Sequence, residues 1–353
     1  MVVIWHYFVL QVQPLHATLI YYAQTAGQLS WTGVDLFFVL SGFLIGGILL
    51  DNRGSPNYFR TFYGRRFFRI VPLYLVWLLT SFGAMWLVTN GAVGKWLHRD
   101  TFSMWPYVFY LQNFWMAAHN AMPNYLGGTW SLAIEEQFYL TLPLIIRFAP
   151  RKSLPWIVGM GIVMAPVLRV LIYHYMPKHD LALFVLMPAR ADSLLFGVLG
   201  AMMVRNDKEV LKLQNSRFQL AGMLAVFASG AGYLTSLPMN GLLMNSVGLT
   251  WMAAFYLCLI LFCTTQTQSL LAGIMRWSWL GWLGTIAYGV YLFHYQVLLA
   301  FYAAFWSVPP EHLYTAGEWR AVIASFAITI AICSASWLYF EKPLVLLGHR
   351  SGY

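Results

Sequence analysis

Residues 322–340 read VIASFAITIAICSASWLYF, a run without a single charged side chain. About 20 apolar residues are enough for an α-helix to cross the hydrocarbon core of a bilayer. Backbone groups in lipid must be hydrogen-bonded within the protein, so a spanning segment is either a helix or a strand of a closed barrel. The run lacks the alternation of polar and apolar residues that a barrel strand has, and it therefore predicts a transmembrane helix.

The composition of the whole chain points the same way. Hydrophobic residues make up 60% of the 353 residues and charged residues only 9%, whereas a soluble domain has about 25% charged residues. The net charge of +9 fits the excess of Lys and Arg in cytoplasmic loops of membrane proteins, so it indicates no nucleic-acid partner. Cys258, Cys263 and Cys333 lie in apolar runs without metal-ligand spacing, and we expect no metal site. We predict an all-α polytopic membrane protein that forms a single domain over residues 1–353.

Ten apolar runs are candidate spans, namely residues 1–20, 31–50, 67–89, 130–148, 154–175, 189–204, 218–237, 244–263, 280–305 and 320–340. An eleventh run, 102–118, is interrupted by Pro106, Gln112 and Asn113. If that run does not cross, 15 of the 21 Lys and Arg residues lie on one side of the membrane, and if it crosses the bias nearly vanishes. The positive-inside rule therefore predicts ten spans with both termini in the cytoplasm, and an interfacial or re-entrant segment at 102–118.

The first run is too short to span. The ten residues MVVIWHYFVL are followed by Gln11, Gln13 and Pro14, and a span needs at least ~17 apolar residues. We expect that helix 1 is truncated at its N-terminus and begins upstream of Met1; a short interfacial helix is the alternative.

Ionisable residues inside the predicted spans are candidates for a functional site. Such a group costs ~2.5–3.5 kcal/mol at the bilayer centre on insertion scales, so it usually faces a cavity or a partner. His6 and, in a later span, His294 are each either a hydrogen-bonded packing residue or a general base. Glu135 and Glu136 are adjacent in one span with Tyr139 beside them. Two carboxylates at this depth argue against a purely structural role.

Arg66 and Arg69 belong to an arginine-rich cytoplasmic run and lie three residues apart, hence on one face of a helix. Two guanidinium groups on one face suit a phosphate or pyrophosphate. Lipid headgroups are the alternative ligand. Together with the polar groups deeper in the bundle, these arginines are expected to form a polar path from one side of the membrane to the other.

The remaining polar positions have simpler interpretations. Asp35 begins a span, where the helix dipole favours an acidic residue. Ser41 would donate a hydrogen bond to a buried ligand, and the glycines that follow it permit close helix packing. Arg190 and Asp192 are interpreted as neutralising each other at the outer interface.

Seven pieces of the sequence, taken in order, resemble the membrane-bound acyltransferase 3 family. They are VVIWHYFV, GVDLFFVLSGFLIGG, FYGRRFFRIVPLY, YLQNF, GTWSLAIEEQFYLTLP, ARADSLLFG and AYGVYLFHYQ, from residue 2 to about residue 300. The resemblance implies ten helices in a bacterial inner membrane and an O-acyltransferase. It implies acetyl-CoA or another acyl-CoA as co-substrate, with no permanently bound cofactor. Implied acceptors are hydroxyls of extracytoplasmic glycans, such as lipopolysaccharide O-antigen, exopolysaccharide, Nod factor or peptidoglycan.

The resemblance also implies roles for particular residues. His6 matches the catalytic histidine of the family, and Arg66 and Arg69 match an RxxR pair that handles the acyl donor. The core of the family's WSL-x-x-E motif is matched by Trp130, Ser131 and Glu135. Two departures from the family pattern are noted: the family's arginine eleven residues before the histidine would fall upstream of Met1, and we expect no SGNH-type esterase domain fused at the C-terminus.

We therefore expect His6 to act as general base or nucleophile, with Glu135 orienting its imidazole. Ser41 would contact the donor, and Asp35 or Tyr288 would bind the acceptor from outside. Further supporting residues are Trp130, Ser131, Glu136, Tyr139, Arg190, Asp192 and His294. The expected partners are membrane lipids, acyl-CoA and a glycan or glycolipid acceptor.

Two alternative functions stay open at this point. A glycan or lipid permease would also have ten helices with a polar interior, but the chain lacks the internal symmetry of many transporters. An acyltransferase that acts on a macrolide-type small molecule is the other alternative. The missing arginine also leaves open a catalytically inactive paralogue.

Overall fold

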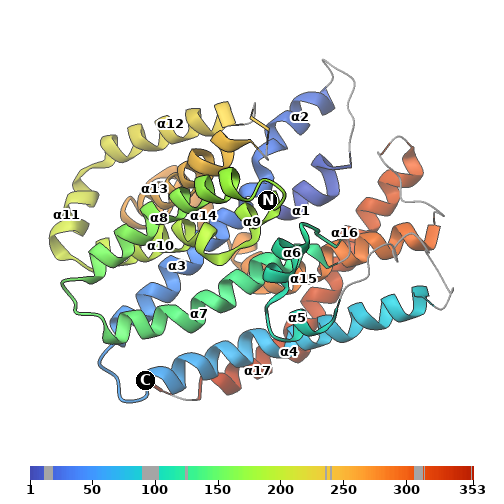
Figure 1. The fold of residues 1–353 in the computed structure, drawn as a ribbon, viewed down its shortest axis with the longest axis horizontal. Helices are drawn as coiled ribbons and strands as arrows, with labels where there is room; N and C mark the ends of the chain where they lie inside the picture. Colours follow the sequence, from blue (N-terminus) through green and yellow to red (C-terminus); the bar gives the residue numbers. More distant parts are fainter. Residues whose placement is uncertain are drawn as a thin grey trace.

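The computed structural model describes residues 1–11, 19–89, 103–123, 126–234, 237–238, 241–305, 313, 315–350 and 352–353. Within these residues the fold is helical and contains no strand (Figure 1). The first nine α-helices are α1 (Val2–Ile4), α2 (Leu19–Gly27), α3 (Gly33–Asp51), α4 (Tyr58–Thr89), α5 (Trp105–Val108), α6 (Gln112–His119), α7 (Trp130–Phe148), α8 (Leu154–Tyr175) and α9 (Asp180–Val185). They are followed by α10 (Met187–Met203), α11 (Asp207–Asn215), α12 (Arg217–Leu234), α13 (Leu249–Thr265), α14 (Leu270–Met275), α15 (Ser278–Phe305), α16 (Ala316–Ser336) and α17 (Lys342–Gly348).

Five short elements interrupt or precede these helices. Two are 3-10 turns, η2 (Gln28–Thr32) and η4 (Gly127–Thr129). Three are π-helical, η1 (Trp5–Val9), η5 (Met244–Gly248) and η6 (Trp337–Glu341). Single π-turns within helices are rare and often mark functional sites.

The membrane-spanning character of the helices follows from their length and composition. Among the described residues, seven stretches are long and apolar enough to cross: Tyr21–Asp51, Tyr58–Ala84, Leu154–Tyr175, Asp180–Met203, Met244–Thr265, Ser278–Phe305 and Ala316–Gly348. The predicted spans 130–148 and 218–237 correspond to α7 and α12, of 19 and 18 residues. Helices thus occupy nine of the ten predicted segments. In the tenth, α1 and η1 cover Val2–Val9, and residues 12–18 lie outside the described residues.

The described part of the run 102–118 forms no helix long enough to cross a membrane. It forms α5 and α6, of 4 and 8 residues, and eight residues of helix rise only about 12 Å. Gln112 and Asn113 are fully buried. The Asn113 and Gln137 side-chain amides donate to each other at 3.2 and 2.9 Å, which holds the segment on α7.

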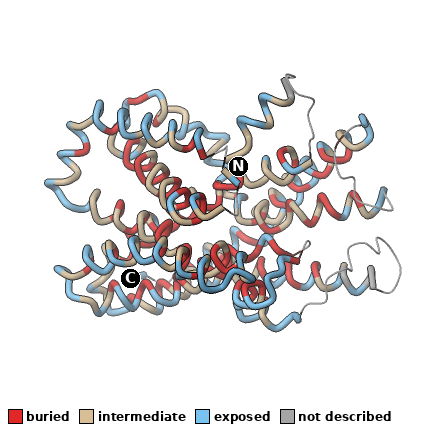
Figure 2. Tube along the Cα trace, turned by 45° about the horizontal axis from the view of Figure 1, so that its top comes forward, coloured by how far each residue is buried: buried red, intermediate tan, exposed pale blue. Residues whose placement is uncertain are grey.

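The outer surface of the bundle is apolar. Figure 2 shows buried residues along the inner helices and exposed residues along the outer faces. Leu79, Phe148 and Trp156 are among many large apolar side chains that are more than two-thirds exposed, at 75%, 72% and 79%. A surface of this kind fits hydrocarbon rather than water, so the structure is that of an all-α polytopic membrane protein.

Close packing of α3 against α10 sets the centre of the fold. A Cβ atom on Gly42 would collide with the carbonyl oxygen of Leu194, and one on Gly197 would collide with that of Val39. Only glycine at both positions allows the two backbones to approach so closely. The prediction that the glycines after Ser41 serve helix packing is confirmed for Gly42.

Two buried ion pairs fix the start of α10. Arg190 pairs with Asp35 of α3 at 2.6 Å, and Arg169 of α8 pairs with Asp192 at 2.8 Å, all four side chains being 0% exposed. The prediction that Arg190 and Asp192 neutralise each other is wrong. Residues two apart on a helix do not face each other, so each takes a partner from a different neighbouring helix.

Candidate active site

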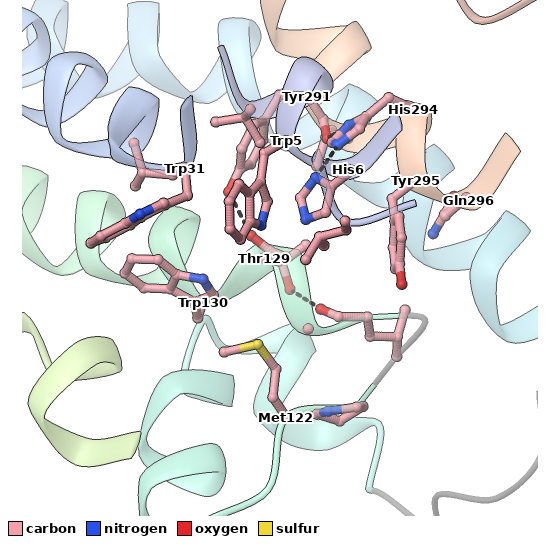
Figure 3. Close-up of a pocket in the computed structure, with 18 of the residues that line it drawn as sticks. Trp5, His6, Trp31, Met122, Thr129, Trp130, Tyr291, His294, Tyr295 and Gln296 are labelled. Carbon is pink, nitrogen blue, oxygen red and sulfur yellow. Dashed lines mark hydrogen bonds between the residues drawn. The ribbon is translucent and has the colours of Figure 1, made fainter. Parts of the chain in front are cut away.

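A cavity of about 360 Å³ opens between η1, η2, η4 and the middle of α15 (Figure 3). Aromatic side chains dominate its lining: Trp5, Trp31, Trp77, Trp130, Phe184, Tyr291 and Tyr295. His6 and His294 also face it. An apolar cavity with a few convergent polar groups is the usual form of a small-molecule site.

The two histidines contact each other inside this lining. Nδ1 of His6 lies 2.9 Å from Nε2 of His294, and the two rings are tilted by 39° with centroids 5.1 Å apart. His6 belongs to the π-turn η1, while His294 comes from the middle of α15. The hydroxyl of Tyr7 donates to the backbone carbonyl of His294 at 2.6 Å. The residue that follows His6 is therefore hydrogen-bonded to the same residue of α15.

A fully buried arginine supports one wall of the cavity from behind. The guanidinium carbon of Arg190 lies 5.8 Å from the ring centroid of Trp130 and 5.1 Å from that of Phe184. These two rings are themselves 4.5 Å apart, centroid to centroid. Cation–π contacts of this kind strengthen when they are desolvated. Arg190 thus holds the cavity wall without lining the cavity.

Asp35 does not meet the expectation that it binds an acceptor from outside. Its carboxylate is 0% exposed and accepts hydrogen bonds from Arg190 at 2.6 Å and from Ser193 at 2.9 Å. Breaking this ion pair to bind an acceptor would leave an unpaired charge in the protein interior, which is unfavourable. Asp35 is therefore the counter-ion of Arg190.

Glu135 is not part of the cavity lining. It lies on α7, and its side chain contacts α3. Its carboxylate accepts from Ser41 at 2.6 Å and from the hydroxyl of Tyr139, and the two hydroxyls are 2.7 Å apart. We expected this carboxylate to orient the His6 imidazole, but no hydrogen bond joins the two in the described part of the chain. The hydrogen-bond partners of the His6 ring are His294 and the backbone of Val2.

Tyr291, which the sequence reasoning did not single out, links α7 to the histidine pair. Its hydroxyl is hydrogen-bonded to Ser131 and donates to the carbonyl of Gly128 at 2.5 Å. Ser131 and Glu135 are one turn apart on α7, and Tyr291 and His294 are one turn apart on α15. The spacing of three between Tyr291 and His294 is the sequence signal that could have found it.

The predicted arginine pair lies on α4, with Arg66 beside the middle of α7 and Arg69 beside η6. The Arg66 guanidinium carbon is 5.2 Å from the ring centroid of Tyr139, and that of Arg69 is 5.1 Å from the ring centroid of Trp337. Both side chains are half-buried, and neither forms an ion pair with any residue that the structure describes. Glu341 is the carboxylate that acts electrostatically on Arg69, and its position in η6 was not anticipated.

Two further candidate residues are Tyr288 of α15 and Glu136 of α7. The hydroxyl of Tyr288 donates to the carbonyl of Ile70 on α4 at 3.0 Å, so this side chain points into the bundle. The contact directs this side chain toward α4, and the expected role of Tyr288 in acceptor binding stays a prediction. Glu136 has one buried carboxylate oxygen with no hydrogen-bond partner in the described residues.

The fold and this site define a helical membrane protein with an aromatic cavity that contains a histidine pair. Residues 1–338 match the family model described as an acyltransferase domain, and the chain belongs to this family. The chain is 27% identical to YrhL of Bacillus subtilis (strain 168), over 90% of this chain and 51% of that protein. It is 28% identical to the peptidoglycan O-acetyltransferase OatA of Listeria monocytogenes (strain EGD-e), over 88% of this chain and 51% of that protein.

A third relative is the O-acetyltransferase OatA of Staphylococcus aureus (strain NCTC 8325), which is 25% identical over 90% of this chain and 53% of that protein. The chain therefore spans about half the length of the curated relatives it matches. No solved structure gives a significant match.

Proposed function

We propose that this protein transfers an acyl group, most often acetyl, from a cytoplasmic acyl-CoA to a hydroxyl of an extracytoplasmic glycan. The observation that carries the proposal is the pair of imidazoles, 2.9 Å apart, in the lining of an aromatic cavity. Membership of the acyltransferase family supports the same reaction class.

His6 is proposed as the general base. The acceptor hydroxyl attacks the thioester carbonyl carbon, the C–O bond forms, and the C–S bond to CoA breaks. His6 accepts the hydroxyl proton and returns it to the departing thiolate, so the site ends the cycle unchanged. Positioned proton transfer of this sort contributes ~10²–10⁴-fold to the rate. Transfer of the acyl group first to His6 and then to the acceptor has the same overall balance.

The donor is proposed to bind at the arginine pair of α4, beside Tyr139 of α7. Arg66 and Arg69 are half-buried and have no ion-pair partner among the described residues, so their donors are available for the phosphates of a nucleotide. Guanidinium groups bind phosphate oxygens in a planar, bidentate manner. Ser41, Glu135 and Tyr139 continue the polar contacts from Arg66 toward the cavity, along the route proposed for the donor's amide-containing arm.

The acceptor is proposed to enter the aromatic cavity from the outer side. Indole and phenol rings offer flat apolar faces for the C–H edges of a sugar ring, with Tyr291 and the histidines nearby for its hydroxyls. All three relatives described above are named as O-acetyltransferases, and the names of two of them specify peptidoglycan. These names favour a peptidoglycan-type acceptor over lipopolysaccharide or exopolysaccharide. The proposed location is a bacterial inner membrane.

The test uses the full-length protein reconstituted in liposomes with acetyl-CoA labelled in the acetyl group. We expect label to move to added glycan fragments, and expect His6→Ala to lower the rate by at least ~10²-fold. His119→Ala is the matched control, because His119 is an exposed histidine whose ring stacks on Trp115. Transport of unmodified glycan without acetyl transfer would refute the proposal. Mass spectrometry of peptidoglycan, lipopolysaccharide and exopolysaccharide from a deletion strain identifies the acceptor.

A further inference from the structure

We propose that His294 is a positioning residue that fixes His6 in a single tautomer, with the proton on Nδ1 and the reactive lone pair on Nε2. The consequence for turnover rests on the proposed function, whereas the tautomer is a property of the resting protein. The inference starts from the backbone of α15.

The tautomer of His294 follows from its backbone contacts. Its Nδ1 lies 2.9 Å from the carbonyl oxygen of Val290 and 2.8 Å from that of Tyr291. Carbonyl oxygens only accept hydrogen bonds, so this nitrogen must carry a proton. In a neutral imidazole the other nitrogen then holds a lone pair. His294 therefore presents Nε2 to its surroundings as an acceptor.

The tautomer of His6 follows from that of His294. Nδ1 of His6 lies 2.9 Å from this acceptor nitrogen, and two lone pairs at that distance would repel each other. Nδ1 of His6 is therefore the donor, and its Nε2 keeps the lone pair. A base is useful only if its free nitrogen faces the reacting proton. The arrangement assigns that role to Nε2, in a residue that lines the cavity.

The His294 imidazole takes the place that a carboxylate holds in a Ser-His-Asp triad. There the third residue holds the imidazole in its correct tautomer and stabilises the imidazolium. Here the third group is neutral, so a protonated His6 shares its Nδ1 proton with an uncharged partner. Two adjacent imidazolium ions in a buried site would repel each other strongly. The pair is thus built to carry one extra proton, not two.

The relative position of the two rings is secured by contacts beside them. The Tyr7 hydroxyl donates to the His294 carbonyl at 2.6 Å and lies 3.3 Å from the hydroxyl of Thr329 on α16. Tyr7 is 5% exposed. The neighbour of His6 is therefore held against α15 and α16, and replacement of the His294 ring removes the hydrogen bond to His6 without removing this anchor.

The experiment compares His294→Leu with His294→Gln in the full-length protein. The Gln side chain can place an amide oxygen near the position of Nε2 and still accept from His6, whereas Leu cannot accept. We expect His294→Leu to lower kcat by ~10²–10³-fold with KM for acetyl-CoA within about twofold, and His294→Gln to recover at least tenfold of that loss, since loss of the tautomer-fixing group in a triad costs up to ~10⁴-fold. In the His6→Ala background, His294→Leu should cause no further loss.

A second readout does not depend on activity. Nitrogen-15 NMR of the histidine-labelled protein, with His6→Ala used for assignment, should show His6 protonated on Nδ1 in the wild type and a mixture of tautomers in His294→Leu. A His6 protonated on Nε2 in the wild type would overturn the inference, as would full kcat in His294→Leu. If the wild type transfers no acyl group, the proposed function fails while the NMR result still decides the tautomer.

Discussion

Two pairs of arginines in this protein lie in the same bundle and have opposite surroundings. Arg169 and Arg190 are 0% exposed, and each has a carboxylate within 2.8 Å. Arg66 and Arg69 are half-buried, rest on aromatic rings, and form no ion pair with any described residue. Each arginine of the first pair has a carboxylate counter-ion inside the protein, whereas neither arginine of the second pair has one among the described residues.

The difference separates arginines that stabilise the folded protein from arginines that are proposed to bind the donor. A buried guanidinium with an internal counter-ion stabilises the protein only as part of the pair, and removal of one partner leaves an uncompensated charge. A guanidinium stacked on an aromatic ring keeps its in-plane N–H donors free for phosphate oxygens. Substitutions at the first pair should therefore affect folding, and substitutions at the second should affect binding of the donor.

The largest effect is expected for the Arg190–Asp35 pair. Arg190→Met leaves the Asp35 carboxylate buried without its cation, which should destabilise the protein by about 3–5 kcal/mol. The double variant Arg190→Met with Asp35→Leu removes both charges and should recover most of that loss. Thermal unfolding in detergent micelles, followed by the fluorescence of the 16 tryptophans, measures both variants.

Arg169→Met is the matched comparison, because Arg169 also forms a fully buried pair but does not contact the cavity wall. An Arg190→Met variant as stable as the wild type would contradict the assignment of this pair to folding.

An intermediate effect, on binding and not on stability, is expected for Arg69. Arg69→Ala should raise KM for acetyl-CoA by ~10–100-fold, since a hydrogen bond to a charged group contributes about 1.5–3 kcal/mol. Its unfolding temperature should stay close to that of the wild type. Arg60→Ala on the same helix is the control, because Arg60 is exposed. Equal KM values for the two variants would remove Arg69 from the donor site.

The comparison also shows what the sequence could and could not predict. The helical segments follow from apolar length, and the shared face of Arg66 and Arg69 follows from their spacing of three, because both signals are local. The partner of Arg190 is 155 residues away and that of His6 is 288 residues away. No local pattern encodes such a distance, so Asp35 was expected at the acceptor side and Glu135 beside His6.

The smallest effect is expected for an exposed ion pair at the other end of α3. Arg205 binds Asp51 with two hydrogen bonds of 2.6 Å, and the side chains are 33% and 55% exposed. Geometry alone would rank this pair with Arg190–Asp35. Water and salt screen exposed charges, so Asp51→Ala should cost no more than about 1 kcal/mol.

A double-mutant cycle on Asp51 and Arg205, run beside one on Asp35 and Arg190, measures the two coupling energies under the same conditions. We expect the buried pair to have the larger coupling energy by several-fold, and expect added salt to weaken only the exposed pair. If both couplings were equal and equally sensitive to salt, burial would not distinguish the arginines of this protein. The contrast between Arg190 and Arg69 would then have to rest on ligand binding alone.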